Sequence, residues 1–301
     1  MTQTPRRYPA MVAALCLLTV LFSLTACQMP SDEDFTVGEL RAEPLSLHTI
    51  EVEWITGDCH VMVHDSEELY VCEETSETNA DNRMRWKLEN GKLTIRFCKP
   101  RLFGKTVDYD KTLYLYVPKN LLGGIESVNI ETVSAHLAVN GLKAETMCLN
   151  TVSGDLTAEG LACGEGKIAS VSGDVTLTSC RADTLTVGNT SGNVLLTASE
   201  AIAALSVSTV SGDQAVSVPI GTHDLELASV SGNVTALISD DASFSLTCES
   251  VSGTVEAEES LRLTVSGDTY TRGEETLKGE ITAVSGNVAL KRLFLITPDE
   301  P

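Results

Sequence analysis

The sequence predicts an all-β fold, a β-solenoid of about eight to nine coils of 19–21 residues with a β-hairpin cap at its N-terminal end. Three observations lead to this prediction. A Val-Ser-Gly-Asp/Asn motif recurs through the second half of the chain. Apolar and polar residues alternate on both sides of the motif, as they do in strands. Val, Thr, Ser, Leu and Gly recur throughout, while aromatic residues make up only 5% of the chain.

The first 26 residues have the layout of a secretory signal. Arg6 and Arg7 precede residues 10–26, which carry no charge. This run ends in Leu-Thr-Ala-Cys, which resembles the lipobox of bacterial lipoproteins. The resemblance implies cleavage between Ala26 and Cys27, lipidation of Cys27, and an extracytoplasmic location in which the N-terminal lipid anchors the chain to the cell membrane. A plain transmembrane anchor is the alternative, because the apolar run is close to the shortest length that spans a bilayer.

The charge of the chain limits its partners. It carries 21 basic and 42 acidic residues, a formal net charge of −21. Such a charge repels nucleic acid and anionic lipid head groups, so we expect no nucleic-acid partner. Residues 27–45 are polar and acidic, and we expect a flexible tether there.

Residues 46–118 predict an N-terminal β cap. Residues 47–54, 61–64 and 69–72 alternate between apolar and polar, and the Asn90-Gly91 pair marks a hairpin turn. Residues 112–118 form a further strand that leads into the first coil. A cap fits a solenoid, since an open strand edge invites aggregation.

Residues 119–295 predict the solenoid, and residues 296–301 a C-terminal tail. The glycines of the motif stand 19, 19, 20, 20, 21, 14 and 19 residues apart. The eight copies have their glycines at Gly154, Gly173, Gly192, Gly212, Gly232, Gly253, Gly267 and Gly286. A degenerate first copy, Val133-Ser134-Ala135, precedes them. Apolar columns stand five and two residues before the glycine, and the phase between them slips, which predicts a bend or bulge there.

Each motif glycine is expected at a corner, because glycine accepts a positive φ and permits a close backbone approach. The residue that follows the glycine predicts a polar ladder along one side of the rod, formed by Asp155, Asp174, Asn193, Asp213, Asn233, Asp268 and Asn287. Stacked carboxylates can collect Ca²⁺. Turn chemistry is the preferred explanation, because Asp alternates with Asn and both bond to nearby backbone amides.

The sequence offers little catalytic chemistry. No catalytic residue, metal site or cofactor is predicted. His60 and His64 would lie too far apart along one strand to share a metal. The cysteines that follow Cys27 are odd in number, seven in all, and a disulfide among Cys59, Cys72 and Cys98 stays open.

At this point the chain resembles the bacterial family called "putative adhesin", or toastrack, labelled DUF4097. The resemblance rests on the Asn90-Gly91 hairpin, on the strand at 113–118, and on repeats such as Val-Ser-Gly-Asp-Val at 171–175. It covers roughly residues 46–295. It implies a β-helical, surface-exposed and non-catalytic protein, and it brings no catalytic residues with it.

Three functions follow as hypotheses. The first is a cell-surface lipoprotein whose solenoid serves as an adhesion, binding or envelope-scaffold module for a surface protein, a glycan or a cationic peptide. The second is an accessory sensor of cell-envelope stress that binds cationic peptides or a membrane partner. The third is a polysaccharide-active enzyme, because some parallel β-helices cleave polysaccharides.

Overall fold

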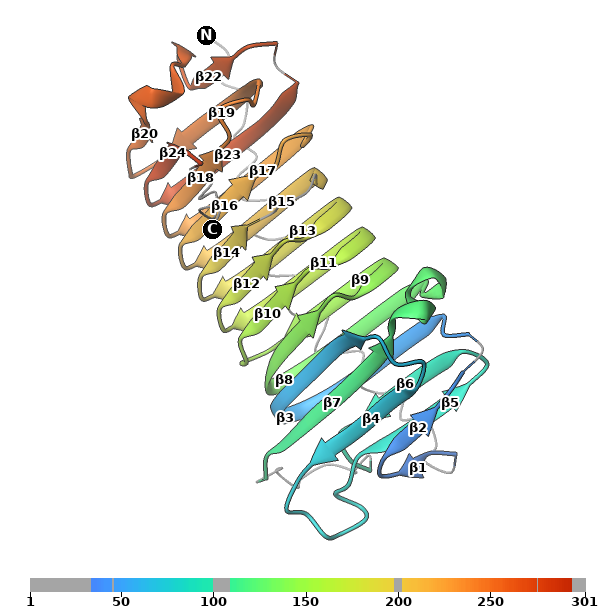
Figure 1. The fold of residues 1–301 in the computed structure, drawn as a ribbon. Helices are drawn as coiled ribbons and strands as arrows, with labels where there is room; N and C mark the ends of the chain where they lie inside the picture. The colour runs from blue at the N-terminus through green and yellow to red at the C-terminus, as the bar shows by residue number, and fades with distance from the viewer. Residues whose placement is uncertain (1–33, 45, 100–108, 198–201, 275, 294–301) are drawn as a thin grey trace, which may run out of the picture.

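The computed structural model describes residues 34–44, 46–99, 109–197, 202–274 and 276–293, most of them in β-strands stacked into a long rack (Figure 1). The predicted all-β solenoid fold is therefore confirmed. The signal segment with Ala26 and Cys27, most of the tether and the C-terminal tail lie outside the described residues. Among the described residues, no helix is long and apolar enough to cross a membrane.

The N-terminal end of the rack consists of seven strands and one short 3-10 helix. They are β1 (Thr36–Val37), β2 (Leu40–Ala42), β3 (Thr49–His64), β4 (Leu69–Glu74), β5 (Arg85–Glu89), β6 (Lys92–Arg96), β7 (Lys111–Pro118) and η2 (Lys119–Gly124). The predicted Asn-Gly hairpin joins β5 to β6, and Asn90 and Gly91 both have positive φ. The strand expected at 112–118 is β7.

The middle of the rack begins with β8 (Ser127–Asn140), after which a long strand alternates with a short one. The long strands are β9 (Lys143–Thr151), β11 (Ala162–Ser172), β13 (Arg181–Ser191), β15 (Ile202–Ser211) and β17 (Asp224–Ser231). The short strands are β10 (Leu156–Glu159), β12 (Val175–Thr178), β14 (Val194–Thr197), β16 (Gln214–Val218) and β18 (Val234–Ile238).

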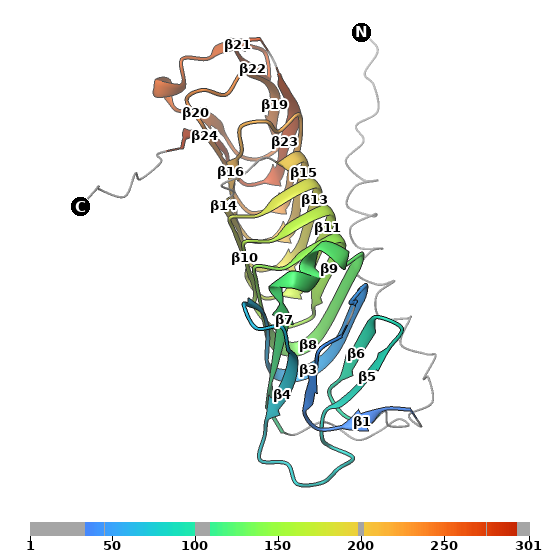
Figure 2. The same ribbon diagram turned by 45° about the vertical axis from the view of Figure 1, so that its right-hand side comes forward.

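Like strands stack on like strands, in parallel and without register slips. The long strands form one row, in which Ile168 pairs with Val187 and Val187 with Val207. The short strands form a second row, in which Val175 pairs with Val194. The strands β3 and β8 are long enough to run through both rows, so β3 pairs with β8 from residue 49 to residue 62. The two rows meet at the corners, as Figure 2 shows from the side.

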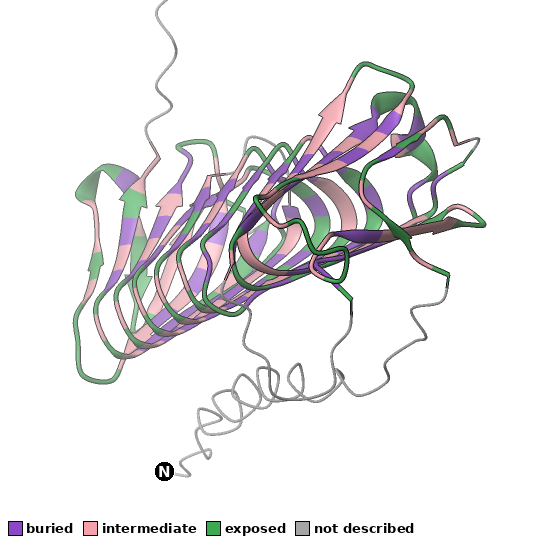
Figure 3. Ribbon diagram, turned by 90° about the horizontal axis from the view of Figure 1, so that it is seen from below, coloured by how far each residue is buried: buried purple, intermediate pink, exposed green. Residues whose placement is uncertain are grey.

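The core lies between the two rows, because each strand turns alternate residues inward. Burial follows this period of two in strands such as β9 and β14, where purple and green or pink segments alternate along the ribbons (Figure 3). Val187, Val207 and Leu227 are fully buried in one long-row column, and Val194 and Val234 are buried in the short row. Each such side chain contributes about 1.5–3 kcal/mol when it leaves water.

The apolar column two residues before the glycine points outward, which the sequence did not indicate. Val133, Val152 and Val251 are 48%, 45% and 53% exposed. The expected bend falls at this position: the long strands skip one pair there, between Val171 and Thr190. The skipped residue turns to the outside of the corner, and the residue before it takes the buried place.

The C-terminal end departs from sequence order. It consists of β19 (Phe244–Ser250), β20 (Val255–Ala257), η3 (Glu259–Leu261), β21 (Thr264–Ser266), β22 (Thr269–Arg272), β23 (Leu277–Ser285) and β24 (Val288–Arg292). The β23–β24 coil lies between the β17–β18 coil and the β19–β20 coil, because β23 pairs with both β17 and β19, and β24 pairs with both β18 and β20. The antiparallel strand β22 then covers the far edge of β19.

The prediction of a motif corner at Gly267 is wrong. Val265, Ser266 and Gly267 lie at the hairpin between β21 and β22 instead. A Cβ atom at Gly267 would meet nothing within 4 Å, whereas the other motif glycines sit against a backbone carbonyl. The 14-residue step in the repeat marks the place where the chain leaves the regular stack to form this hairpin.

Candidate functional site

The motif glycines other than Gly267 form one column of close backbone contacts. A Cβ atom on Gly173 would lie 2.3 Å from the carbonyl oxygen of Gly154, and one on Gly212 would lie 2.0 Å from that of Gly192. No side chain fits at these corners. The column runs in stack order through Gly154, Gly173, Gly192, Gly212, Gly232, Gly286 and Gly253.

The residues after these glycines form the expected ladder, and their side chains bond to the next coil. In each step a side-chain oxygen accepts a hydrogen bond from the backbone N–H of the equivalent residue one layer on. The steps are Asp155 to Asp174 (2.9 Å), Asp174 to Asn193 (2.8 Å), Asn193 to Asp213 (3.1 Å), Asp213 to Asn233 (2.8 Å), Asn233 to Asn287 (3.0 Å) and Asn287 to Thr254 (2.9 Å). Only an acceptor atom at the δ position is required, which explains why Asp and Asn alternate.

The two ends of this ladder explain the departures from the motif. At the N-terminal end His136 replaces the carboxylate, and its Nδ1 accepts the N–H of Asp155 at 3.2 Å. At the other end Thr254 has no δ oxygen, and it lies in the coil that closes the ladder. Asp268, which the sequence placed in the ladder, lies outside it, and its backbone oxygen accepts the N–H of Cys248 at 2.8 Å.

A second polar column, three residues before the glycine, was missed in the sequence. Its members are buried: Thr132, Thr151, Ser170, Asn189, Thr209 and Ser229 are at most 4% exposed. Thr151 and Thr209 donate to the carbonyl oxygens of Gly154 and Gly212, at 3.1 and 3.2 Å. These bonds satisfy corner carbonyls inside the core. The recurrence of Thr, Ser and Asn at this position from residue 132 to residue 229 was the signal that could have revealed the column, which Ala283 interrupts in the later coil.

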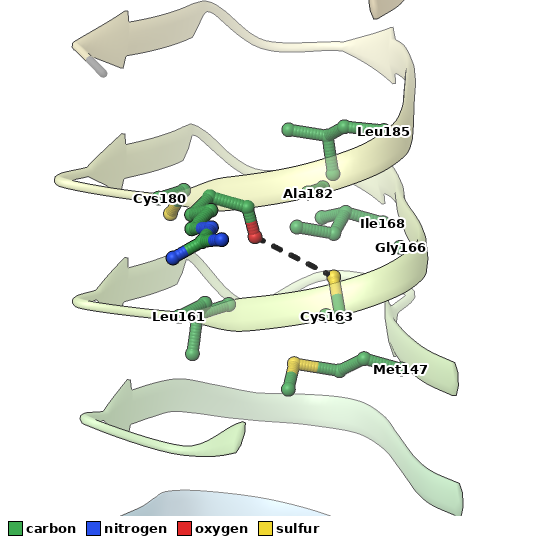
Figure 4. Close-up of a pocket in the computed structure, with 9 residues that line it drawn as sticks. Met147, Leu161, Cys163, Gly166, Ile168, Cys180, Ala182 and Leu185 are labelled. Carbon is green, nitrogen blue, oxygen red and sulfur yellow. Dashed lines mark hydrogen bonds between the residues drawn. The ribbon is translucent and has the colours of Figure 1, made fainter. Parts of the chain in front are cut away.

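The cysteines of the folded part are unpaired. All seven described cysteines are free, so no disulfide joins Cys59, Cys72 and Cys98. Burial raises the pKa of Cys248 to about 12 and that of Cys163 to about 11. Cys163 and Cys180 line a small apolar hollow beneath Gly166, where the thiol of Cys163 points to the carbonyl oxygen of Arg181 (Figure 4). This environment makes the thiols packing groups of low reactivity.

Among the described residues, no group of three or more His, Cys, Asp or Glu side chains could hold a metal ion. The ladder places only one side chain per coil at each corner. Its δ1 oxygens already accept backbone hydrogens. The geometry therefore supports turn chemistry as the role of the ladder.

The most distinctive surface lies at the N-terminal end, on the outward side of β3, β4 and β7. There Tyr70, Tyr114, Tyr116, His60 and His64 form what we call the aromatic row. The rings of Tyr70 and Tyr116 lie 5.7 Å apart at 16°, those of Tyr114 and Tyr116 6.3 Å apart at 14°, and those of His60 and Tyr114 5.2 Å apart at 19°. The sequence signal was the alternation Tyr-Leu-Tyr in β7 together with His60 in the neighbouring strand.

A buried ion pair lies on the inward side of the same strands. The Lys111 ammonium is 2.8 Å from the Glu73 carboxylate, and both side chains are almost fully buried. Lys111 also lies 4.0 Å from the ring centre of Phe97. Burial lowers the pKa of Lys111, and its bond to Glu73 offsets part of this effect. The ammonium donates to the backbone carbonyl oxygens of Asn82 (2.9 Å) and Phe97. Glu73 accepts the backbone N–H of Met84 (2.9 Å) and forms an ion pair with Arg83, so the pair fixes the segment before β5 to the cap.

A stack of coils joined to one another by a ladder of hydrogen bonds is typical of a β-solenoid repeat protein, and this is the class to which the protein belongs. The chain belongs to the Toastrack DUF4097 family, whose model matches residues 45–291. The resemblance seen in the sequence is thus confirmed. Comparison with curated protein sequences gives no match.

Several solved structures are similar to this chain. One is a "putative adhesin" from Bacteroides fragilis, with 11% identity and a TM-score of 0.49, covering 87% of this chain and 98% of that one. A second "putative adhesin", from Parabacteroides merdae, has 11% identity and a TM-score of 0.41 over 88% and 98% of the two chains. A "putative lipid binding protein" from Parabacteroides distasonis has 13% identity and a TM-score of 0.44 over 83% and 96%.

Proposed function

We propose that this chain is a non-catalytic binding module of the bacterial cell surface, held at the membrane by a lipid on Cys27. The observation that carries the proposal is the ladder from His136 to Thr254. It joins each coil to the next, so the folded part forms one continuous body that can hold a binding surface away from the membrane. Family membership and the names of the similar structures support a role in adhesion.

The lipid anchor is tested by fractionation of cells that express the full chain. Cys27→Ser should release the protein from the membrane fraction, because the acceptor for the lipid is lost. Cys16→Ser, in the apolar segment of the signal, is the matched control and should leave the protein in the membrane fraction. A Cys27→Ser variant that stays in the membrane fraction after residues 1–26 have been removed would overturn the lipoprotein proposal, whereas one that keeps residues 10–26 is held by that apolar segment.

Binding is tested with the chain from residue 28 to residue 301, immobilised and exposed to matrix proteins, glycans, cell-wall fractions and cationic peptides. Saturable binding to a matrix protein or glycan at physiological salt supports adhesion. An envelope-stress sensor is the second candidate, because the net charge of −21 favours cationic partners. Binding limited to cationic peptides and lost at physiological salt would favour that candidate over adhesion.

A further inference from the structure

We propose that the aromatic row is a binding site for a neutral glycan. This inference rests on the proposed function as a surface binding module and assigns a ligand class to one place on it. The row occupies the outward side of three adjacent strands, β3, β4 and β7, at the N-terminal end of the rack (Figure 1).

The rings of the row form one array. Tyr114 pairs across the strands with His60 on one side and with Cys72 on the other, and Tyr116 pairs with Tyr70. The rings of His60, Tyr114, Tyr116 and Tyr70 follow one another at 5.2 to 6.3 Å, with planes within 19° of parallel, whereas His64 lies 5.7 Å from Tyr116 at a tilt of 44°. Near-parallel rings in a continuous line offer a ligand a repeated apolar surface. Tyr supplies such a surface at low cost in conformational entropy, since only two side-chain torsions become fixed.

The fold does not require aromatic residues at these positions. The strand β8 continues the same outward column one layer on, with Ala138 opposite His60. Further along the rack the column holds Thr157 and Thr176. These small residues maintain the same strand pairing as the tyrosines do. The concentration of rings in three layers therefore points to a use other than stacking the coils.

The surroundings of the row supply both hydrogen-bond donors and hydrogen-bond acceptors. At one end the Arg41 guanidinium lies 4.1 Å from the ring centre of Tyr70, and Glu39 and Glu68 flank it. Towards the corner, a surface hollow beside the row is lined by Asp58, Glu74 and other polar residues. Ligand sites typically combine aromatic walls with a few polar groups that fix orientation.

This mixture of groups matches a chain of neutral sugars. The apolar C–H groups of a pyranose ring can pack against the parts of the stacked rings that face solvent, while its hydroxyls bond to carboxylates, guanidinium and phenols. Burial raises the pKa of Tyr114, and a hydrogen bond with Cys72 helps raise the pKa of Tyr70 to about 12, so both phenols keep their protons at neutral pH. The net charge of −21 disfavours acidic glycans.

The test is affinity electrophoresis of the chain from residue 28 to residue 301 in gels that contain one neutral polysaccharide each: mannan, xylan, mixed-linkage β-glucan or hydroxyethyl cellulose. For any polysaccharide that retards the protein, the affinity is then measured by calorimetry with the matching hexasaccharide. We expect at least one polysaccharide to retard the protein, with an affinity that is insensitive to salt. Tyr114→Ala and Tyr116→Ala should each weaken binding by about tenfold or more, as loss of a central aromatic contact does in other interfaces.

Two controls separate binding from folding. Thr176→Ala changes the same outward column within the regular stack, and it should bind as the unaltered chain does. Tyr114→Phe keeps the ring and should retain most of the affinity. Each variant is accepted only if its thermal unfolding midpoint stays close to that of the unaltered chain, and His60→Ala replaces any tyrosine variant that fails to fold.

The inference is overturned if no neutral polysaccharide retards the protein, or if the folded Tyr114→Ala and Tyr116→Ala variants bind as well as the unaltered chain. Its failure can be told from that of the proposed function. A double variant that still captures a surface protein or cell-wall fraction leaves the binding module in place and removes only the glycan site. An unaltered chain that captures nothing in any assay contradicts both.

Discussion

The residues that tolerate the least change in side chain lie where one coil packs on the next. The motif glycines lie against carbonyl oxygens of the preceding layer, and the buried Thr, Ser and Asn side chains beside them bond to corner carbonyls. A change at such a corner affects two coils, because the same carbonyl group is involved in the stacking of both. Away from the corners the outward positions tolerate Thr, Ala, Leu and Glu in one column.

Gly212→Ala should destabilise the protein by about 2–4 kcal/mol, because the new Cβ would lie 2.0 Å from the carbonyl oxygen of Gly192 and φ at this residue is +141°. Gly123→Ala is the matched control: nothing lies within 4 Å of its Cβ position. It should change the unfolding free energy by no more than about 0.5 kcal/mol. Urea unfolding of both variants measures the difference, and equal midpoints would contradict the close contact.

The buried Lys111–Glu73 pair predicts a strong dependence of each partner on the other. Lys111→Met should cost up to about 3–5 kcal/mol, because the buried Glu73 carboxylate loses the ammonium and keeps only its ion pair with Arg83. The double variant Lys111→Met with Glu73→Gln should cost less than the sum of the two single changes. Lys119→Met, which removes an exposed pair with Asp65, is the control and should have almost no effect. Additive costs in the double-mutant cycle would show that the pair is not coupled.

Buried thiols predict a loss of stability at alkaline pH. Burial raises the pKa of Cys248 to about 12, whereas the thiol in the unfolded chain titrates near its ordinary value. Between these two values the folded state holds a proton that the unfolded state has lost. The stabilisation is complete below the unfolded pKa and declines as pH rises towards the folded pKa. Cys248→Ala should therefore flatten the fall in the unfolding free energy between pH 8.5 and 10.5, relative to Ser245→Ala; parallel slopes would contradict this.

Among the elements, the coil formed by β23 and β24 determines how the C-terminal end is assembled. It supplies the only strands, within the described residues, that join the β17–β18 coil to the β19–β20 coil. The coils that stabilise one another at this end are therefore neighbours in the stack and not neighbours in the sequence.

Ile281→Ala should loosen two coils at once. Ile281 is fully buried in β23 and pairs with Leu227 below and Cys248 above. Removing its side chain should cost about 2–5 kcal/mol and speed hydrogen exchange in residues 244–250 as well as 277–285. Leu246→Ala in β19 is the matched change one layer further out, and it should speed exchange in β19 while β17 stays protected. Faster exchange confined to β23 in the Ile281→Ala variant would be incompatible with the inserted position.

The sequence predicted the stacked coils and every motif corner except Gly267, but not the order of the last two coils. The corner was predictable because Gly-Asp/Asn recurs at a fixed spacing and has a local backbone reason. The order was not, because Leu227, Ile281 and Cys248 are all apolar and fill the same column, so any coil fits against any other. The outward turn of Val152 was missed for a different reason: one skipped pair reverses the facing of a residue, and its location depends on strand pairing. The aromatic row needed β7 to be placed between β3 and β4, from which it is distant in sequence.

The whole molecule is an elongated rack whose ends differ. Antiparallel strands cover both ends, β4 and β5 at the N-terminal end and β22 at the other. Such covering protects the parallel stack from pairing with other chains. The aromatic row lies at the N-terminal end, whereas the same outward column in the regular middle holds Thr, Ala and Leu.

The elongated shape predicts a large radius of gyration. A compact domain of this length would have a radius of gyration of about 19 Å. Small-angle X-ray scattering of the chain from residue 28 to residue 301 should give a clearly larger value and a pair-distance distribution with a long tail. The same measurement in 0.5 M salt should leave the folded part unchanged, because the ladder is made of hydrogen bonds and the core is apolar. A compact, symmetric distribution would contradict the rack.

The inserted coil also sets an order of events in time. A chain that is made from its N-terminus delivers β17 and β18 before β19 and β20, yet the layer that lies between these coils arrives last. The β19–β20 coil must therefore wait without its partner until β23 and β24 have emerged. Folding of the regular coils can proceed during synthesis, one layer after another, whereas closure of the far end is a single late step that needs residues up to Arg292. Interrupted synthesis would consequently leave the edge of β17 and β18 uncovered, and proteases would find incomplete chains at that edge.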